Sequence, residues 1–183
     1  MTHAVFSRDD LTIELPQVPA SLGNNGYDIS KLLTASGDTT IDVGFANTAS
    51  CQSSITFIDG EAGVLRYRGY PIEQLAEQAT FLEVSYLVLY GELPTSAQLE
   101  AFSTSIARHH IIDERLREMF RTMPRKSHPM PVLAAAINAL STFSVSRYGD
   151  DAYDLDRATH VLMGSVPTLA AYGYKNSVGQ PFL

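Results

Sequence analysis

Hydrophobic residues in the first 70 positions of this chain follow short-period patterns that favour strands. Residues 12–15 alternate hydrophobic and polar side chains and are closed by Pro16, and glycines and asparagines at 23–26 favour a turn. Residues 54–58 and 64–67 are rich in β-branched, aromatic and aliphatic side chains, and the loop between them contains two glycines. We therefore predict an N-terminal arm with one short strand, followed by a β-hairpin.

In the rest of the chain hydrophobic residues recur every three or four positions, the spacing of an amphipathic helix. Pro71 can occupy the first position of a helix, where its missing N–H has no consequence. Thr80 with Glu83, and Thr95 with Gln98, have the spacing of a capping box at a helix start. The predicted helices span residues 72–78, 84–90, 99–109, a segment around 116–120, 132–145, and about 151–178.

The last two predicted helices have features that bear on packing. Four alanines between 134 and 139 would let a neighbouring backbone approach closely, so we expect the helix over 132–145 to be buried against other helices. Pro167 lies inside the final helix and lacks the N–H of a helical hydrogen bond, so we expect a kink there.

These elements predict a mainly α protein with a small N-terminal β arm and hairpin. We assign residues 1–50 to the arm, 51–70 to the hairpin and 71–183 to a helical part of a larger domain.

Composition narrows the function classes. The chain has 183 residues, of which 45% are hydrophobic and 18% charged, as in a soluble globular protein. A formal charge of −7 argues against nucleic-acid binding, which needs clustered lysine and arginine. No apolar run approaches the roughly 20 residues of a membrane span, and residues 1–10 lack the pattern of a secretory signal. We predict a cytoplasmic protein, with the single cysteine, Cys51, as a small core residue.

The five histidines are the obvious candidates for acid–base or metal chemistry, and none is convincingly placed. His109 and His110 are adjacent and point in different directions on a helix, whereas a helical metal pair needs a spacing of three or four. His128 precedes a proline, where capping of a helix is the better interpretation. We interpret His160 as a hydrogen-bonded core histidine, and place His3 in the terminal arm. We therefore expect no metal and no cofactor.

Other short patterns are equally weak. Asp59 and Glu61 resemble the start of a calcium loop, but the further ligands are missing, so a hairpin turn is the better interpretation. Arg66 and Arg68 would share one side of a strand and could meet a phosphate or carboxylate; exposed arginines on an edge strand are the favoured reading. The motifs of nucleophile elbows, zincins, phosphate loops and dinucleotide folds are absent from the sequence.

A longer pattern carries more information. Residues 42–51 and 55–72 resemble the N-terminal segment of bacterial citrate synthases, and shorter segments continue the resemblance in order, over roughly residues 40–183. Those segments are Phe81–Leu87, Gly91–Pro94, Ser127–Met130, Tyr174–Lys175 and Gly179–Phe182. The resemblance implies a citrate synthase-like, multi-helix fold. It also implies a homodimeric or larger enzyme of the tricarboxylic acid cycle, which condenses acetyl-CoA with oxaloacetate and water to citrate and CoA.

The resemblance further implies that this chain is the N-terminal portion of a longer enzyme, with an incomplete fold. The family's catalytic histidines, aspartate and substrate-binding arginines come from later segments, beyond Leu183, so no catalytic residue is assigned here. We expect the chain alone to be inactive. Helices near 132–145 and 152–178 match family helices that pack across the dimer interface, so we also expect self-association or poor solubility.

One departure from the family bears on regulation. The branch that NADH inhibits carries a tyrosine, an arginine and a lysine where this chain has Ser144, Val161 and Ser165, although Arg108 and His109 resemble part of that branch's site. The nucleotide phosphates would lose cationic partners, so we expect no NADH inhibition.

Two alternatives stay open. 2-Methylcitrate synthase uses propionyl-CoA on the same fold, and the residues that discriminate it lie beyond Leu183. From a different class, the chain could be a stand-alone, non-catalytic helical dimerisation module.

Overall fold

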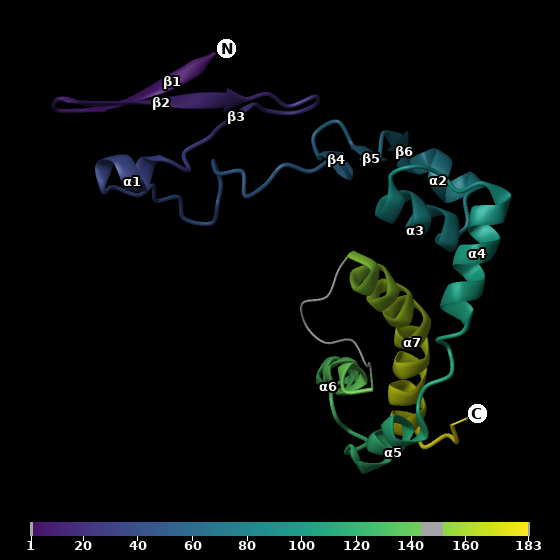
Figure 1. Ribbon diagram of the computed structural model, residues 1–183. Helices are drawn as coiled ribbons and strands as arrows, with labels where there is room; N and C mark the ends of the chain where they lie inside the picture. Colours follow the sequence, from purple (N-terminus) through teal and green to yellow (C-terminus); the bar gives the residue numbers. More distant parts are fainter. Residues whose placement is uncertain (1, 144–151, 183) are drawn as a thin grey trace. The chain divides into compact units, whose positions relative to one another are not determined.

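The computed structural model of the protein describes residues 2–143 and 152–182 (Figure 1). The chain divides into two compact units, Met1–Ala79 and Thr80–Leu183. The first contains two small antiparallel sheets and two short helices, and the second is helical. The predicted mainly α character is confirmed.

Residues 3–27 of the first unit form a three-stranded sheet. Strand β1 (His3–Arg8) pairs antiparallel with β2 (Leu11–Val18), and β2 pairs with β3 (Gly26–Tyr27). The prediction that Pro16 ends the strand is wrong, because β2 continues to Val18. Proline removes only a donor, and its carbonyl oxygen accepts the N–H of Asp28 at 2.9 Å, so the ladder to β3 survives. A short helix, α1 (Leu32–Ser36), lies against β2 and buries Leu32.

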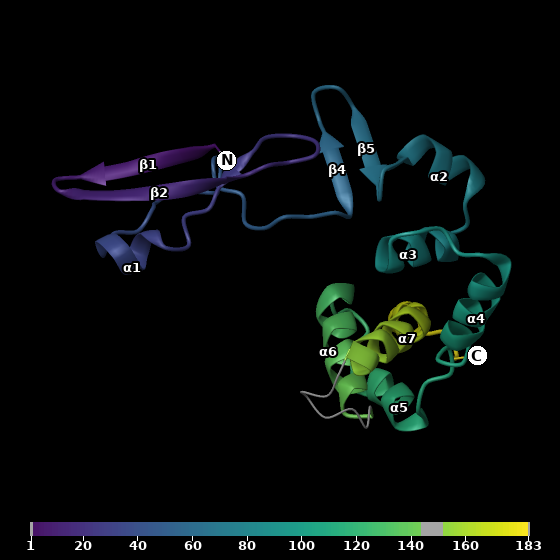
Figure 2. The same ribbon diagram turned by 45° about the horizontal axis from the view of Figure 1, so that its top comes forward.

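The predicted hairpin is confirmed. Strands β4 (Thr56–Asp59) and β5 (Val64–Tyr67) pair antiparallel and lie side by side in Figure 2. The carboxylate of Asp59 accepts the N–H groups of Glu61 at 3.1 Å and Ala62 at 2.9 Å, which closes the turn. Strand β6 (Tyr70–Pro71) adds a third strand beside β5, and α2 (Ile72–Gln78) follows within its predicted bounds.

The second unit consists of helices whose N-termini agree with the sequence signals. Both capping boxes form: Thr80 with Glu83 begins one helix and Thr95 with Gln98 begins the next. The helices are α3 (Phe81–Tyr90), α4 (Ser96–Ala107), α5 (Glu114–Thr122), α6 (Pro129–Ser141) and α7 (Ala152–Val178).

Several helix bounds differ from the prediction: α3 and α4 begin three residues earlier, at Phe81 and Ser96, directly after their capping residues Thr80 and Thr95. Helix α4 ends at Ala107, not at 109, because hydroxyls from α7 take up the carbonyl groups that follow its last turn. Helix α6 begins at Pro129, not at 132, because the ring of His128 caps it. It ends at Ser141; positions 144 and 145 of the predicted helix lie outside the described residues.

The core of the second unit lies where α5, α6 and α7 pack together, an arrangement that both ribbon views show (Figures 1 and 2). Ala136 on α6 has no exposed surface, so the prediction that the alanine-rich helix is buried against other helices is confirmed. The buried members of this core are Leu116, Phe120, Val132, Ala136 and Leu169.

Helix α7 runs the length of this core and is assigned as one helix through Pro167, so the kink stays a prediction. Among the described residues, no helix combines the length and the apolar character that crossing a membrane requires.

Candidate functional site

Four polar side chains from three helices meet beside α7, at a place we call the α7 junction: Tyr90 of α3, Ser105 of α4, and Asp156 and His160 of α7. The His160 ring is hydrogen-bonded at both nitrogens, through Nδ1 to the Ser105 hydroxyl at 2.8 Å and through Nε2 to the Tyr90 hydroxyl at 3.1 Å. The Tyr90 hydroxyl also bonds the Asp156 carboxylate. The His160 side chain is only 13% exposed.

Aromatic rings hold the junction in place. The Phe102 ring meets the His160 ring edge-on with 5.1 Å between centroids, and meets the Tyr86 and Tyr90 rings edge-on at 5.4 and 6.0 Å. These separations are those of favourable aromatic pairs. Phe102 is itself buried, so the polar groups stand on an apolar support that restricts their movement.

The direction of the hydrogen bonds follows from the partners. An ionised carboxylate only accepts, so Tyr90 donates its hydroxyl proton to Asp156. The Tyr90 oxygen then accepts from Nε2–H of His160, and Nδ1 accepts from the Ser105 hydroxyl. Both ring nitrogens are thus engaged by protein groups. The interpretation of His160 as a hydrogen-bonded histidine is confirmed.

Burial raises the pKa of the Tyr90 phenol far above its ordinary value, and the hydrogen bond to Asp156 and the negative charge of that carboxylate raise it further. The neighbouring His109 has a lowered pKa, mainly from burial and then from the positive charges of nearby groups, Arg157 and Arg108 among them. The two effects have the same origin, since a partly buried site disfavours the charged form of each group.

Tyr90 should therefore keep its proton when other tyrosines have ionised. Because the folded-state pKa is raised, Tyr90 contributes stability that is fully present below the unfolded pKa and lost as pH rises through the folded value. The measurement is tyrosinate absorbance against pH, with the Tyr90→Phe variant subtracted. We expect no Tyr90 signal near pH 10, where an unperturbed tyrosine ionises; a Tyr90 step there would contradict the site's electrostatics.

The remaining histidines have structural positions. His128 is the N-cap of α6 and its Nδ1 accepts the N–H of Met130 at 3.2 Å, which confirms the capping interpretation. His109 and His110 follow α4, and their carbonyl oxygens accept the hydroxyls of Ser165 at 3.0 Å and Thr168 at 2.8 Å. His3 lies in β1 with Nε2 4.0 Å from a Glu14 oxygen. Within residues 2–143 and 152–182, no cluster of three or more metal-binding side chains occurs.

Two sequence expectations are corrected. Arg66 lies in β5, which is paired on both sides and is not an edge strand, while Arg68 follows the strand with a φ of 49°. The two arginines therefore do not share one side of a strand: Arg68 reaches the Ser54 hydroxyl at 2.9 Å and Arg66 reaches the Gly69 carbonyl at 3.5 Å. Cys51 is exposed and is not a core residue, because the segment around it forms no strand or helix.

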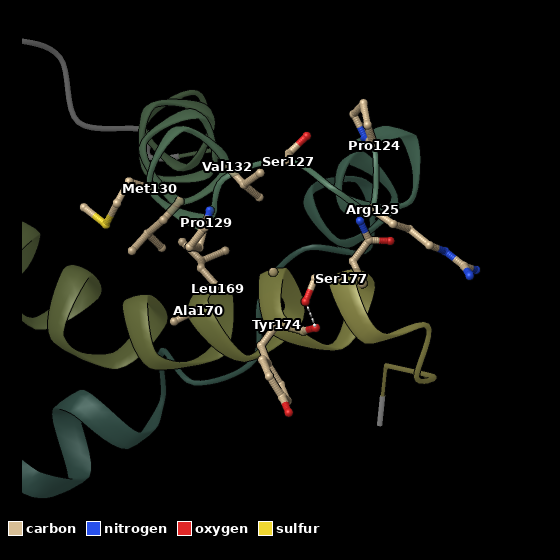
Figure 3. Close-up of a pocket in the computed structure, with 13 residues that line it drawn as sticks. Pro124, Arg125, Ser127, Pro129, Met130, Val132, Leu169, Ala170, Tyr174 and Ser177 are labelled. Carbon is tan, nitrogen blue, oxygen red and sulfur yellow. Dashed lines mark hydrogen bonds between the residues drawn. The ribbon is translucent and has the colours of Figure 1, made fainter.

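A cavity of about 260 Å³ lies between the start of α6 and the second half of α7 (Figure 3). Apolar groups, among them Pro129, Met130 and Leu169, form much of its wall. Figure 3 shows the guanidinium of Arg125 extending away from these side chains. The Ser177 hydroxyl donates to the Tyr174 carbonyl at 2.7 Å. The cavity thus offers apolar contact more than acid–base chemistry.

Sequence analysis did not foresee the α7 junction as a unit. Tyr90 is 66 residues from Asp156, and Ser105 is 55 residues from His160, so helical periodicity carries no sign of their meeting. The one local signal was the spacing of Asp156 and His160, which puts both on one face of α7.

Comparisons with known proteins agree on one family. The family model "Citrate synthase, C-terminal domain" matches residues 44–183. The protein "Citrate synthase 1" of Mycobacterium tuberculosis is 52% identical over 177 residues, covering 93% of this chain and 40% of the relative. Citrate synthase of Corynebacterium glutamicum is 46% identical over 171 residues, covering 93% and 39%. The chain thus spans about two fifths of the length of these relatives.

Solved structures give the same result. Citrate synthase of Pyrobaculum aerophilum matches with a TM-score of 0.69 and 36% identity, over 77% of this chain and 37% of that one. Citrate synthase of Thermoplasma acidophilum, solved as a ternary complex with carboxymethyl coenzyme A and oxaloacetate, matches with a TM-score of 0.71 and 27% identity, over 79% and 38%.

Proposed function

The chain belongs to the citrate synthase family, and we propose that it forms part of an enzyme that condenses acetyl-CoA with oxaloacetate and water to give citrate and CoA, a reaction of the tricarboxylic acid cycle. The observation that carries the proposal is the 52% identity to a relative named citrate synthase over 93% of this chain. The structure of the Thermoplasma relative, which holds a coenzyme A derivative and oxaloacetate, supports the two substrates.

The assay is release of free CoA thiol from acyl-CoA by the whole protein, with and without oxaloacetate. We expect oxaloacetate-dependent release with acetyl-CoA and slower release with propionyl-CoA. Faster release with propionyl-CoA would instead support the alternative, a 2-methylcitrate synthase. No release with either thioester would favour the other alternative, a non-catalytic helical dimerisation module.

We place the catalytic groups outside residues 1–183. The condensation needs a carboxylate base to take a proton from the thioester methyl group and a donor to stabilise the enolate oxygen. His128 and His160 are already engaged as a helix cap and as part of the α7 junction. We therefore expect the 183-residue chain alone to be inactive, and the whole enzyme to be cytoplasmic and to need neither a metal nor a cofactor.

We propose that the chain also supplies part of a homodimer interface, through α7 and the neighbouring α6. On α7 a row of apolar residues with a spacing of four forms a ridge that winds slowly around the helix, the kind of ridge that packs into the groove of a neighbouring helix. The row comprises Ala158, Leu162, Val166, Ala170 and Tyr174. Leu162 is 42% exposed and Tyr174 is 65% exposed. No other part of the described chain therefore fully covers these side chains. A second copy of the chain is the occupant we propose, since it would bury this row.

Replacing Leu162 with glutamate should weaken dimerisation at least tenfold, because a charge would be buried in an apolar contact. The measurement is sedimentation equilibrium of the variant and of the unchanged chain. Ala101→Glu is the matched control, since Ala101 is an exposed position on α4, outside the α7 row. Equal dissociation constants for Leu162→Glu and the unchanged chain would contradict this interface.

We further propose that NADH does not inhibit the whole enzyme. Ser165 is 3% exposed and its hydroxyl is bonded to the His109 carbonyl, and Val161 is apolar, so neither offers a charge to a phosphate. The third position, Ser144, lies outside the described residues. The measurement is a fluorescence titration of the whole protein with NADH; tight binding would refute the proposal.

A further inference from the structure

The N-terminal part of α7 is attached to the rest of the second unit in a different way from its middle. At residues 164–168, α7 packs closely against backbone atoms at the end of α4 and just after it. A Cβ on Gly164 would lie 2.4 Å from the Ile106 carbonyl oxygen, and the Ser165 and Thr168 hydroxyls bond the carbonyls that follow α4. Such contacts leave this segment little freedom.

The segment before Gly164 is held mainly by side chains. Leu155 is 74% exposed, and Arg157 and Ala158 are also exposed, so much of the surface of this segment is open to solvent in the described chain. Its other face carries Asp156 and His160, one helical turn apart. Their bonds to Tyr90 and Ser105 reach α3 and α4.

We propose that the α7 junction is a latch, which fixes the N-terminal part of α7 to α3 and α4 and can open while the rest of the second unit stays folded. Tyr90 is its central member, because its one hydroxyl donates to Asp156 and accepts from His160. Ser105 completes the chain on α4.

Two properties make the junction act as a unit. The hydrogen bonds run in one direction from Ser105 to the Asp156 carboxylate, so each donor strengthens the next. The Tyr90 hydroxyl carries its proton at neutral pH, as tyrosine hydroxyls ordinarily do, so the donor to Asp156 is always present there. Removing the Tyr90 hydroxyl alone therefore breaks two of the three links.

The location of the latch favours local opening over global unfolding. Local openings draw on segments with few buried apolar groups, and none of residues 155–163 is itself buried, whereas Phe120 and Leu169 in the main core are fully buried. Asp156 is 49% exposed, so water can replace the Tyr90 hydroxyl at the carboxylate once the bond breaks.

The test is hydrogen exchange of backbone amides in the full chain, comparing Tyr90→Phe with Tyr86→Phe. The second variant is the matched control, since Tyr86 lies on the same helix and its ring also meets the Phe102 ring, while none of the three hydrogen bonds of the latch involves its hydroxyl. For Tyr90→Phe we expect exchange in residues 155–163 to rise at least tenfold, with residues 169–178 and α6 unchanged. Tyr86→Phe should leave all three segments unchanged.

Asp156→Ala provides a second variant at a half-exposed position, where folding is not at risk. It should raise exchange in the same segment, and the double variant Tyr90→Phe/Asp156→Ala should exceed the larger single effect by less than threefold, because the groups act together. Sedimentation of each sample checks that the variants and the unchanged chain have the same association state. A uniform rise across the second unit, full additivity, or no rise in residues 155–163 would each overturn the latch.

Discussion

Replacing Gly164 with alanine should lower the free energy of unfolding of the helical unit by about 3 kcal/mol, near the upper end of the usual range for overpacked sites. The new Cβ would lie 2.4 Å from the Ile106 carbonyl oxygen and 2.8 Å from the His109 Cβ. The first of these atoms belongs to backbone, so it cannot rotate away as a flexible side chain would. Helix α7 would have to move away from α4, and the bonds from Ser165 and Thr168 would be strained.

The matched control is the other glycine of α7. A Cβ on Gly173 would lie 3.7 Å from Val132 Cγ1 and 3.8 Å from Phe120 Cε1, which is ordinary contact. Alanine is favoured over glycine inside a helix by about 1 kcal/mol, so Gly173→Ala should be neutral or stabilising. Urea unfolding followed by circular dichroism gives both values. Equal midpoints for the two variants would show that α7 does not approach α4 as described.

Phe120→Ala should cost about 4 kcal/mol, a value typical for deletion of a large core side chain. Phe120 has no exposed surface, and its ring meets Tyr172 and Phe182 edge-on at 6.0 and 6.4 Å between centroids. Three helices converge on this residue, so the cavity could not close by movement of one side chain.

Phe81→Ala is the corresponding control, because Phe81 is 78% exposed at the start of α3. Exposed substitutions of this kind change stability by about 0.5 kcal/mol or less. The same denaturant titration compares the two variants. A loss for Phe120→Ala as small as that for Phe81→Ala would mean that the core does not lie between α5, α6 and α7.

The elements that the sequence predicted well are those with local causes. Thr80 with Glu83 and Thr95 with Gln98 form their capping boxes because each box involves only residues three positions apart. The turn at Asp59 likewise closes on the next three residues. Hydrogen bonds between residues this close in the chain can be predicted from a single sequence.

The features that sequence analysis missed depend on contacts between distant segments. Pro16 was predicted to end the strand. Its carbonyl oxygen accepts the N–H of Asp28 instead, so β2 continues. Helix α4 ends two residues earlier than predicted. Ser165 and Thr168, more than 50 residues later in the chain, donate their hydroxyls to the carbonyl groups that follow it. The α7 junction has the same origin. The hydrophobic periodicity of one helix does not show which side chains of another helix will face it.

The citrate synthase likeness was carried by a different kind of signal. The run over residues 42–72 resembles the family as a long sequence of specific residues, although no familiar catalytic motif occurs in it. The family match over residues 44–183 and the structural neighbours confirm both the family and the citrate synthase-like fold. The histidines, which invited catalytic interpretations, instead have structural partners at α6 and the α7 junction.

We propose that this chain is the framework part of a citrate synthase and that the catalytic groups lie elsewhere in the enzyme. The most direct test is oxaloacetate-dependent release of thiol from acetyl-CoA, measured side by side for the whole protein and for residues 1–183 alone. We expect sustained release from the whole protein and none above background from the 183-residue chain. Release by residues 1–183 alone, or none by the whole protein, would contradict the account.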